Sequence, residues 1–135
     1  MVDVTVTATE VLSTDDTQEA SGDLGATVAA GEVVYLDSST GTYKLADTDV
    51  LSLHAAKAIA LNGGGSGQPV RLAVGGKLDP GFTVALGEIY VLSGDAGKIA
   101  PVADLANTDY TFIIGIGVTT SSLLLIMKTA GVIHY

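Results

Sequence analysis

The side chains with the greatest capacity for catalysis or metal binding are few and lie far apart in this sequence. The two histidines are His54 and His134, and neither has the His-x-x-x-His spacing or the flanking carboxylates of a metal site. Cysteine is absent, which excludes a thiolate metal site and a disulfide framework. We therefore expect each histidine at the surface or at an interface, and we expect no metal site.

Four short motifs resemble parts of catalytic or binding sites but are incomplete. Gly64-Gly-Ser66-Gly-Gln68 lacks the last glycine of a nucleophile elbow. The glycine-rich segment Asn62–Gly67 lacks the Lys-Ser/Thr pair that holds phosphates, and it suits a hairpin connection. Asp47-Thr-Asp49 begins like a calcium loop without its glycine and distal glutamate, and Asp15-Asp16 lies in a polar segment that leaves both carboxylates solvated. The sequence thus predicts a protein that is not an enzyme, with no catalytic, cofactor-binding or metal-binding residues and no cofactor.

Length and composition predict one soluble domain. The chain has 135 residues, of which 47% are hydrophobic and 16% charged, which is too apolar for a disordered chain and sufficient for one core. The longest apolar stretches, Phe112–Val118 and Leu123–Met127, are far shorter than the roughly 20 residues of a membrane helix. The first residues lack the basic and apolar stretches of a secretory signal. We expect a protein that is made in the cytoplasm and does not bind membranes.

The net charge of −9 is concentrated near the N-terminus. Residues 1–43 contain eight acidic side chains and no lysine or arginine, whereas residues 44–135 contain seven acidic and six basic side chains. Because nucleic-acid affinity comes mainly from clustered lysine and arginine, we expect no binding to nucleic acid. Alternatively, the acidic side chains of residues 1–43 only keep the surface soluble.

The pattern of apolar residues predicts short strands separated by glycine-rich turns. Residues 2–7 alternate like a half-buried strand, residues 13–23 are polar and predict a loop or an arm, and residues 48–57 fit a helical turn. The other expected strands share a short aliphatic core and a neighbouring turn: Val33–Leu36, Tyr43–Leu45, Ala58–Leu61, Val70–Val74, Ile89–Leu92, Phe112–Val118 and Leu123–Met127.

An internal repeat of about 56 residues is the most informative feature. Four landmarks recur in the same order: Gly31–Leu36 with Gly87–Leu92, Lys44-Leu45 with Lys98-Ile99, Ala58–Asn62 with Gly115–Thr119, and Val70–Val74 with Leu123–Met127. Two units are too few for a solenoid. They predict two similar β-modules that pack across a pseudo-twofold axis into one small barrel or sandwich.

The predicted organisation is one all-β domain over residues 1–135. Residues 1–27 are expected to form an N-terminal strand or arm and an acidic loop, and residues 28–135 a duplicated β core. Alanine or glycine alternates with branched residues in Ala58–Leu61 and Gly115–Val118. One face of each of these strands is therefore nearly bare, which lets another backbone or layer approach closely.

The order of several short sequence motifs resembles that in the head decoration or cement proteins of tailed bacteriophages. The resemblance covers residues 28–133 and lies in Ala30–Asp37, Ala58–Asn62, Gly67–Val70, Tyr90–Ser93, Ala96–Pro101, Leu123–Ile126 and Ala130–Val132. It implies a small β-barrel, tulip-like or jelly-roll-like, that binds the major capsid protein on the outside of the expanded shell. It also implies a homodimer or homotrimer in the virion and no catalytic residues.

Two other functions remain open on the sequence. A tail or fibre module also contains repeated β-units, although fibres usually have longer periodic stalks. A carbohydrate-binding β-module usually presents aromatic platforms, and here tryptophan is absent and aromatic residues make up 5% of the chain. For a capsid-binding role, Val2–Thr7 is the segment that we expect to add as a strand to a neighbouring sheet.

Overall fold

The computed structural model describes residues 4–46, 57–93, 97–102 and 110–133, with the backbone alone at residues 15, 110–111 and 127–133. This part of the chain is mostly β-strand and contains no α-helix, which confirms the predicted all-β class. No helix in it is long and apolar enough to cross a membrane. The elements are the 3-10 helix η1 (Ala8–Glu10) and the strands β1 (Val11–Asp23), β2 (Val33–Asp37), β3 (Thr42–Leu45), β4 (Lys57–Ala60), β5 (Pro69–Pro80), β6 (Ile89–Leu92), β7 (Ile99–Pro101), β8 (Tyr110–Gly117) and β9 (Leu123–Ile133).

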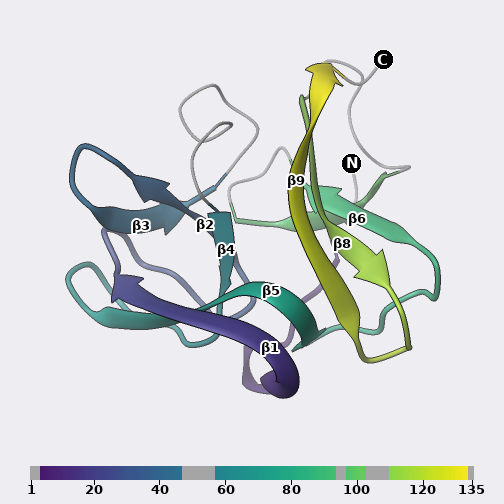
Figure 1. Cartoon of the computed structure of the whole chain (residues 1–135). Coiled ribbons are helices and arrows are strands. Elements are labelled where there is room, and N and C mark those ends of the chain that lie inside the picture. The colour runs from purple at the N-terminus through teal and green to yellow at the C-terminus, as the bar shows by residue number, and fades with distance from the viewer. Residues whose placement is uncertain (1–3, 47–56, 94–96, 103–109, 134–135) are drawn as a thin grey trace.

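The nine strands form one antiparallel sheet that curls into a half-barrel (Figure 1). The order of the strands is β3-β2-β4-β5-β9-β8-β6-β7, and β1 pairs along β5 outside this path. The first module therefore comprises β2 to β5, and the second module comprises β6 to β9. The shared core lies inside the curl and combines aliphatic side chains of both modules.

The two modules repeat the same strand register, as the sequence repeat predicts. Val33 of β2 pairs with Ile59 of β4, and Ile89 of β6, 56 residues further on, pairs with Ile116 of β8. The turns that precede β2 and β6 also match. Gly31 donates its N–H to the carbonyl oxygen of Ala60 at 2.8 Å, and Gly87 donates to Gly117 at the same distance, with φ of +89° and +79° at the two turn glycines.

One of the four expected equivalences is wrong by two residues. Lys44-Leu45 was matched to Lys98-Ile99 on the shared Lys-aliphatic pair. In the structure, Leu45 pairs with Val34, and the residue that pairs with the equivalent Tyr90 is Pro101. Strand pairing therefore makes Leu45 of β3 equivalent to Pro101 of β7, although the side chains of Leu45 and Ile99 are more alike.

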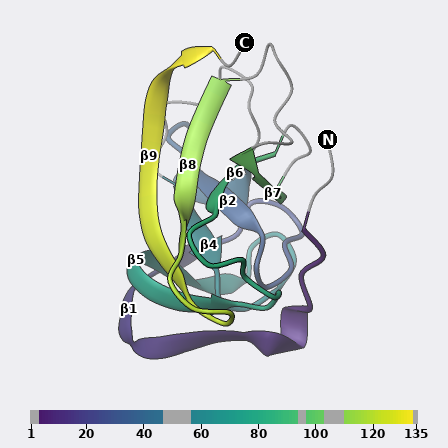
Figure 2. The same ribbon diagram turned by 90° about the vertical axis from the view of Figure 1, so that its right-hand side faces the viewer.

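The N-terminal segment differs most from the prediction. Residues 13–23 form most of β1 rather than a loop or an arm, and residues 4–7 form no strand. Instead, Val4 donates its N–H to the carbonyl oxygen of Ile99 at 2.9 Å, and Thr7 donates to that of Gly81 at 2.8 Å, so the segment runs from β7 to the residue just after β5. Figure 2 shows β1 crossing below the upright pair β8 and β9. The N-terminal segment is thus used to cover edges of its own sheet.

The predicted helical turn over residues 48–57 lies almost entirely outside the described residues. Its last residue, Lys57, is the first residue of β4. The seven strands expected between residues 33 and 127 are all present, with β5, β8 and β9 longer than expected.

A bulge in β5 reverses which face of the sheet points toward the shared core in the first and in the second module. The register with β1 shifts between Gln18 opposite Gly75 and Glu19 opposite Ala73, which leaves Val74 as the extra residue. Ala73 and Leu78 both lie in the shared core, although residues five apart on an unbroken strand face opposite sides. The bulge therefore reverses which side chains of β5 point inward.

Because of this reversal, the modules are not related by the predicted twofold axis. A twofold would place the same positions of both modules in the shared core. Val33 lies in that core with 0% exposure, whereas the equivalent Ile89 is 38% exposed. Conversely, Tyr90 lies in the shared core, and its equivalent Val34 lies in a second cluster under Leu24 and Val28.

Candidate interaction surfaces

Several candidate residues from the sequence lie outside the described part of the structure. These are His54, His134 and the motif Asp47-Thr-Asp49. Within the described residues, no three histidine or acidic side chains are grouped in a way that could hold a metal ion. The expected absence of a metal site therefore stays a prediction for the whole chain.

The glycine-rich motif is a closed turn in the structure. Gly65 donates its N–H to the side-chain oxygen of Gln68 at 2.7 Å, and Ser66 is exposed at the tip of this turn. Asp16 is also exposed, as expected for a carboxylate in a polar segment. Ser66 and Asp16 are thus both solvent-exposed surface groups.

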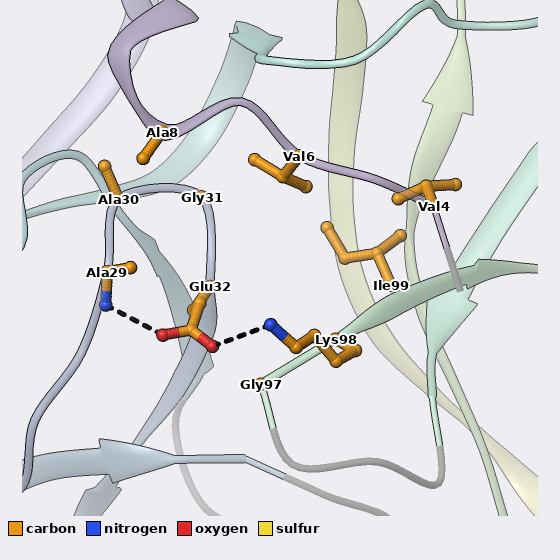
Figure 3. Close-up of a pocket in the computed structure, with 10 residues that line it drawn as sticks. All are labelled: Val4, Val6, Ala8, Ala29, Ala30, Gly31, Glu32, Gly97, Lys98 and Ile99. Atoms are coloured by element: carbon orange, nitrogen blue, oxygen red, sulfur yellow. Dashed lines mark hydrogen bonds and ion pairs between the residues drawn. The ribbon is translucent and has the colours of Figure 1, made fainter.

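A small pocket lies where residues 4–8 cross the two modules (Figure 3). Its volume is about 90 Å³, well below the roughly 300–1,000 Å³ of typical ligand pockets. The carboxylate of Glu32 accepts a hydrogen bond from the N–H of Ala29 at 2.7 Å and forms an ion pair with Lys98 at 3.2 Å. Since both oxygens of this carboxylate are engaged and most other walls are apolar, the pocket is best explained as a packing seam.

The tyrosines with described side chains take part in packing. Tyr90 is buried, its hydroxyl oxygen accepts a hydrogen bond from the N–H of Ala85 at 3.0 Å, and its ring lies 5.2 Å from that of Phe82. Tyr35 and Tyr43 are half-buried against the two cores. None of the three forms an exposed platform of the kind that stacks on sugars.

The first extended surface is the acidic edge, which we define as residues 12–23 of β1. One side of β1 pairs with β5, and no other strand of the described chain pairs with its other side. The exposed acids Asp16, Glu19 and Asp23 follow this edge, with Glu19 in an exposed ion pair to Arg71 at 2.8 Å. Such a strand presents unpaired backbone groups that another chain could extend.

The middle of the acidic edge is irregular. The register shifts between Ser13 and Thr17, where the hydroxyl of Thr17 accepts a hydrogen bond from the N–H of Thr14 at 2.8 Å and itself donates to the carbonyl of Lys77. Bulges and acidic side chains both hinder the pairing of one edge with a second copy of itself. This edge therefore fits a partner of different chemistry better than another copy of this chain.

The second surface is the aliphatic row, which we define as Ile89, Ile116 and Leu124. These three residues pair directly across β6, β8 and β9, and Lys77 of β5 continues the row beyond Leu124. Their neighbours along each strand are buried, so the row lies on the outer face of the second module. Ile126 and Leu86 flank it with 44% and 72% exposure.

Sequence reasoning missed this outer row because the apolar pattern of these short strands does not say which face of each strand turns outward. A signal was available in the repeat. Leu86 stands where the first module has Ala30, which gives the second module a large aliphatic residue at a turn. The exposure itself follows from the bulge in β5, which no local pattern revealed.

Lys57 lies between the two modules and has an unusual environment. It is buried at the start of β4, with its ammonium group 4.3 Å from the centre of the Phe112 ring on β8. Burial lowers the pKa of Lys57 from 10.5 to about 8. This lysine is therefore a pH-sensitive part of the packing rather than an exposed cation.

Comparison with protein-family models and with curated proteins finds no match to this sequence. The two surfaces of the sheet and the resemblance of residues 28–133 are therefore the features that point to a function.

Proposed function

We propose that this protein is a structural virion protein that binds the outer surface of the assembled major capsid shell and stabilises it. The observation that carries the proposal is the acidic edge, which makes up nearly all of the 13-residue strand β1, is paired on one side and carries a row of exposed acids. The order of motifs over residues 28–133, which resembles phage head decoration proteins, supports the same role. The virion exterior is the corresponding location, and the major capsid protein is the partner.

The physical basis of this role is selective binding. A protein that binds the expanded lattice and not its precursor stabilises the expanded form by mass action. The many copies on one shell add their contributions, since each lattice subunit gains a contact. A free strand edge supplies backbone hydrogen bonds for such a contact, and carboxylates beside it select a basic surface.

The structure changes which segment we expect to touch the shell. Residues 2–7 were expected to add to a neighbouring sheet, but Val4 and Val6 pack against the shared core of this chain. Removing residues 1–12 would therefore expose that core as well as alter any arm. The acidic edge is the better candidate because its outer side is not needed to cover the core of this chain.

The direct test is binding to purified expanded shells that lack this protein. We expect sedimentation with the shells at a simple fraction of one copy per coat subunit and no sedimentation with unexpanded shells. The variant Asp16→Asn/Asp23→Asn should bind at least tenfold more weakly, and the matched variant Glu88→Gln, on the second module, should bind normally. Unchanged binding of Asp16→Asn/Asp23→Asn would place the acidic edge away from the shell.

The stoichiometry in virions separates the alternatives. A few copies per particle would favour a tail or fibre module. Complete absence from particles would favour a ligand-binding module, whose sugar-binding version is already disfavoured by the packed tyrosines and the small pocket.

A further inference from the structure

The sequence repeat also covers the turn that leads into each module. Residues 23–32 and 79–88 are identical at seven of ten positions, in the pattern Asp-x-Gly-x-Thr-Val-Ala-x-Gly-Glu. We call residues 29–32 the first turn and residues 85–88 the second turn. In each turn the glutamate donates its N–H to the carbonyl oxygen of the alanine three residues earlier, at 3.2 Å from Glu32 and 3.1 Å from Glu88. One chain therefore contains two copies of the same turn, and their surroundings can be compared directly.

The first turn is covered by other parts of this chain (Figure 3). Gly31 is buried, and Val6 occupies the space that a Cβ atom of Gly31 would need. The carboxylate of Glu32 accepts a hydrogen bond from the N–H of Ala29 at 2.7 Å and forms an ion pair with Lys98 of the second module at 3.2 Å. The covering groups are thus a β-branched aliphatic side chain on the glycine and an ammonium group on the glutamate.

The second turn has the same backbone in open surroundings. Gly87 is exposed, and no atom lies within 4 Å of the position that its Cβ atom would take. The N–H of Ala85 donates to the hydroxyl oxygen of Tyr90 at 3.0 Å, so it does not hold the glutamate of its own turn as happens in the first turn. Within the described residues, no side chain or N–H group pairs with the carboxylate of Glu88.

The two turns also differ at the residue before the glycine. Ala30 of the first turn packs against the shared core, whereas Leu86 of the second turn is 72% exposed. Ile89, which directly follows the second turn, is 38% exposed. Exposed aliphatic residues that lie beside a charged group are a feature of protein–protein interaction sites. The second turn therefore offers aliphatic contact area, an open glycine and a carboxylate that no described residue neutralises.

We propose that the second turn binds an extended segment of another protein that carries a β-branched aliphatic residue and a lysine or arginine. The aliphatic residue packs on Gly87 and Leu86, and the basic residue pairs with Glu88. The first turn is the template for this occupant, because Val6 and Lys98 provide the same two groups there. The residue after Val6 has the extended backbone angles φ −93° and ψ 106°. This inference does not depend on the proposed capsid function.

The second turn suits a basic partner and is distinct from the acidic edge. The chain has a net charge of −9, so it attracts a basic segment and repels another copy of itself. Three strands separate the two surfaces: Gly87 donates to Gly117 of β8, which pairs with Leu123 of β9, which pairs with Leu78 of β5, which pairs with Ser13 of β1. The second turn and the acidic edge are therefore able to bind different partners at the same time.

The test is an NMR titration of the isotope-labelled full chain with short peptides. Lys-Val-Thr-Val-Thr-Ala and Val-Thr-Val-Thr-Ala-Lys reproduce residues 4–8 with a lysine at either end, because the first turn does not fix the order of the two groups. We expect at least one peptide to shift the backbone amide signals of Gly87, Glu88 and Ile89 saturably and to leave the signal of Gly31 unchanged. The same peptide with glutamine in place of lysine should bind about threefold more weakly, as expected for the loss of an exposed ion pair.

Point variants locate the binding on the second turn. Leu86→Ser should weaken binding about tenfold, because it removes the apolar contact at the turn. The matched control Leu12→Ser removes a 57% exposed leucine from β1 and should bind the peptide normally. Glu88→Gln should abolish the preference for lysine over glutamine in the peptide, whereas Asp16→Asn on the acidic edge should keep it.

Three outcomes would overturn the proposal. The first is no saturable shift with either peptide, and the second is shifts confined to the first turn or to β1. The third is shifts at the second turn that grow with protein concentration when no peptide is present, since the occupant would then be a second copy of this chain. Glu88→Gln should still bind capsid shells normally, so a change in peptide binding without a change in shell binding separates the second turn from the proposed capsid function.

Discussion

The first and second modules share a strand ladder but differ in which side of it they bury. The pair Val33–Ile59 and the pair Ile89–Ile116 have the same register, yet one is enclosed and the other borders solvent. Local sequence therefore determines how the strands of a module pair. A single extra residue in β5 determines which face of the second module turns inward.

The two modules also differ in which residues cover the other face of their strands. The face of the first module that points away from the shared core is covered by Leu24 and Val28, which form a separate cluster with Ala58, Ala60 and Leu72. In the second module, Val84 corresponds to Val28 and Tyr90 corresponds to Val34, and both belong to the shared core instead. Similar sequences can thus be buried once by their own turn and once by another module.

The largest expected effect comes from Gly76 of β5, where β1 approaches closely. Gly76 has a φ of +78°, and a Cβ atom there would overlap the carbonyl oxygen of Asp16. We expect Gly76→Ala to lower the free energy of unfolding by about 4 kcal/mol, of which the positive φ accounts for about 1–2 kcal/mol and the overlap for the rest. Urea denaturation of both proteins measures this loss.

Gly41 provides the matched control for Gly76. Its φ is +71°, but no atom lies within 4 Å of the position that a Cβ would take. Gly41→Ala should therefore lose only about 1–2 kcal/mol, from the backbone conformation alone. Equal losses in the two variants would show that the close approach of β1 to Gly76 is unimportant.

The second prediction compares equivalent isoleucines. Ile59→Ala opens a cavity in the shared core and should lower the free energy of unfolding by about 3–4 kcal/mol. Ile116→Ala removes the same atoms from the partly exposed row and should lose about 1 kcal/mol. Thermal unfolding of the two variants and the natural protein measures these losses. Similar losses would contradict the difference in burial between the modules.

Much of the fold could be predicted because it follows from local rules. Short aliphatic segments and glycine-rich turns predicted the strands between residues 33 and 127 except β7, and the repeat predicted the shared register of β2–β4 and β6–β8. The bare faces of the small-residue strands are confirmed at Gly117, where the backbone of Ala85 leaves no room for a side chain.

The remaining features depend on contacts between distant segments. β1 has no apolar period, since only Val11 of its described side chains is buried, and it becomes a strand through backbone pairing with β5. The reversal at Val74 depends on a register shift between the same two strands. Both candidate surfaces follow from these long-range pairings, so composition and spacing alone could not locate them.

The third prediction concerns the buried lysine at the junction of the modules. The pKa of Lys57 is lowered to about 8 in the folded chain and returns to 10.5 on unfolding. Between these values the unfolded chain binds more protons, so the contribution of Lys57 to stability should rise as the pH increases from about 8 to 10.5. The difference in free energy of unfolding between the natural protein and Lys57→Met should therefore shift in favour of the natural protein over this range. A difference that is independent of pH would mean that Lys57 titrates normally.

The smallest effect is expected at the β2–β3 hairpin, where the modules differ in their turn chemistry. Asp37 accepts hydrogen bonds from Lys44 at 2.8 Å and from the N–H and hydroxyl of Ser39, and these bonds lower the pKa of Asp37 from 3.8 to about 2. The equivalent residue of the second module is the buried Ser93, which cannot make such an ion pair.

A lowered carboxyl pKa stabilises the fold above about pH 4, and this contribution is lost as the pH falls toward 2. Asp37→Asn should therefore be slightly less stable than the natural protein at pH 6, and the two should converge near pH 2. Lys44→Met is the companion variant, because it removes the largest cause of the pKa shift while keeping the carboxylate. If the natural protein and Asp37→Asn differ equally at pH 6 and pH 2, then the turn geometry rather than the charge pair stabilises this hairpin. The distinction between the hairpins of the two modules would then be one of shape, as it already is for their faces.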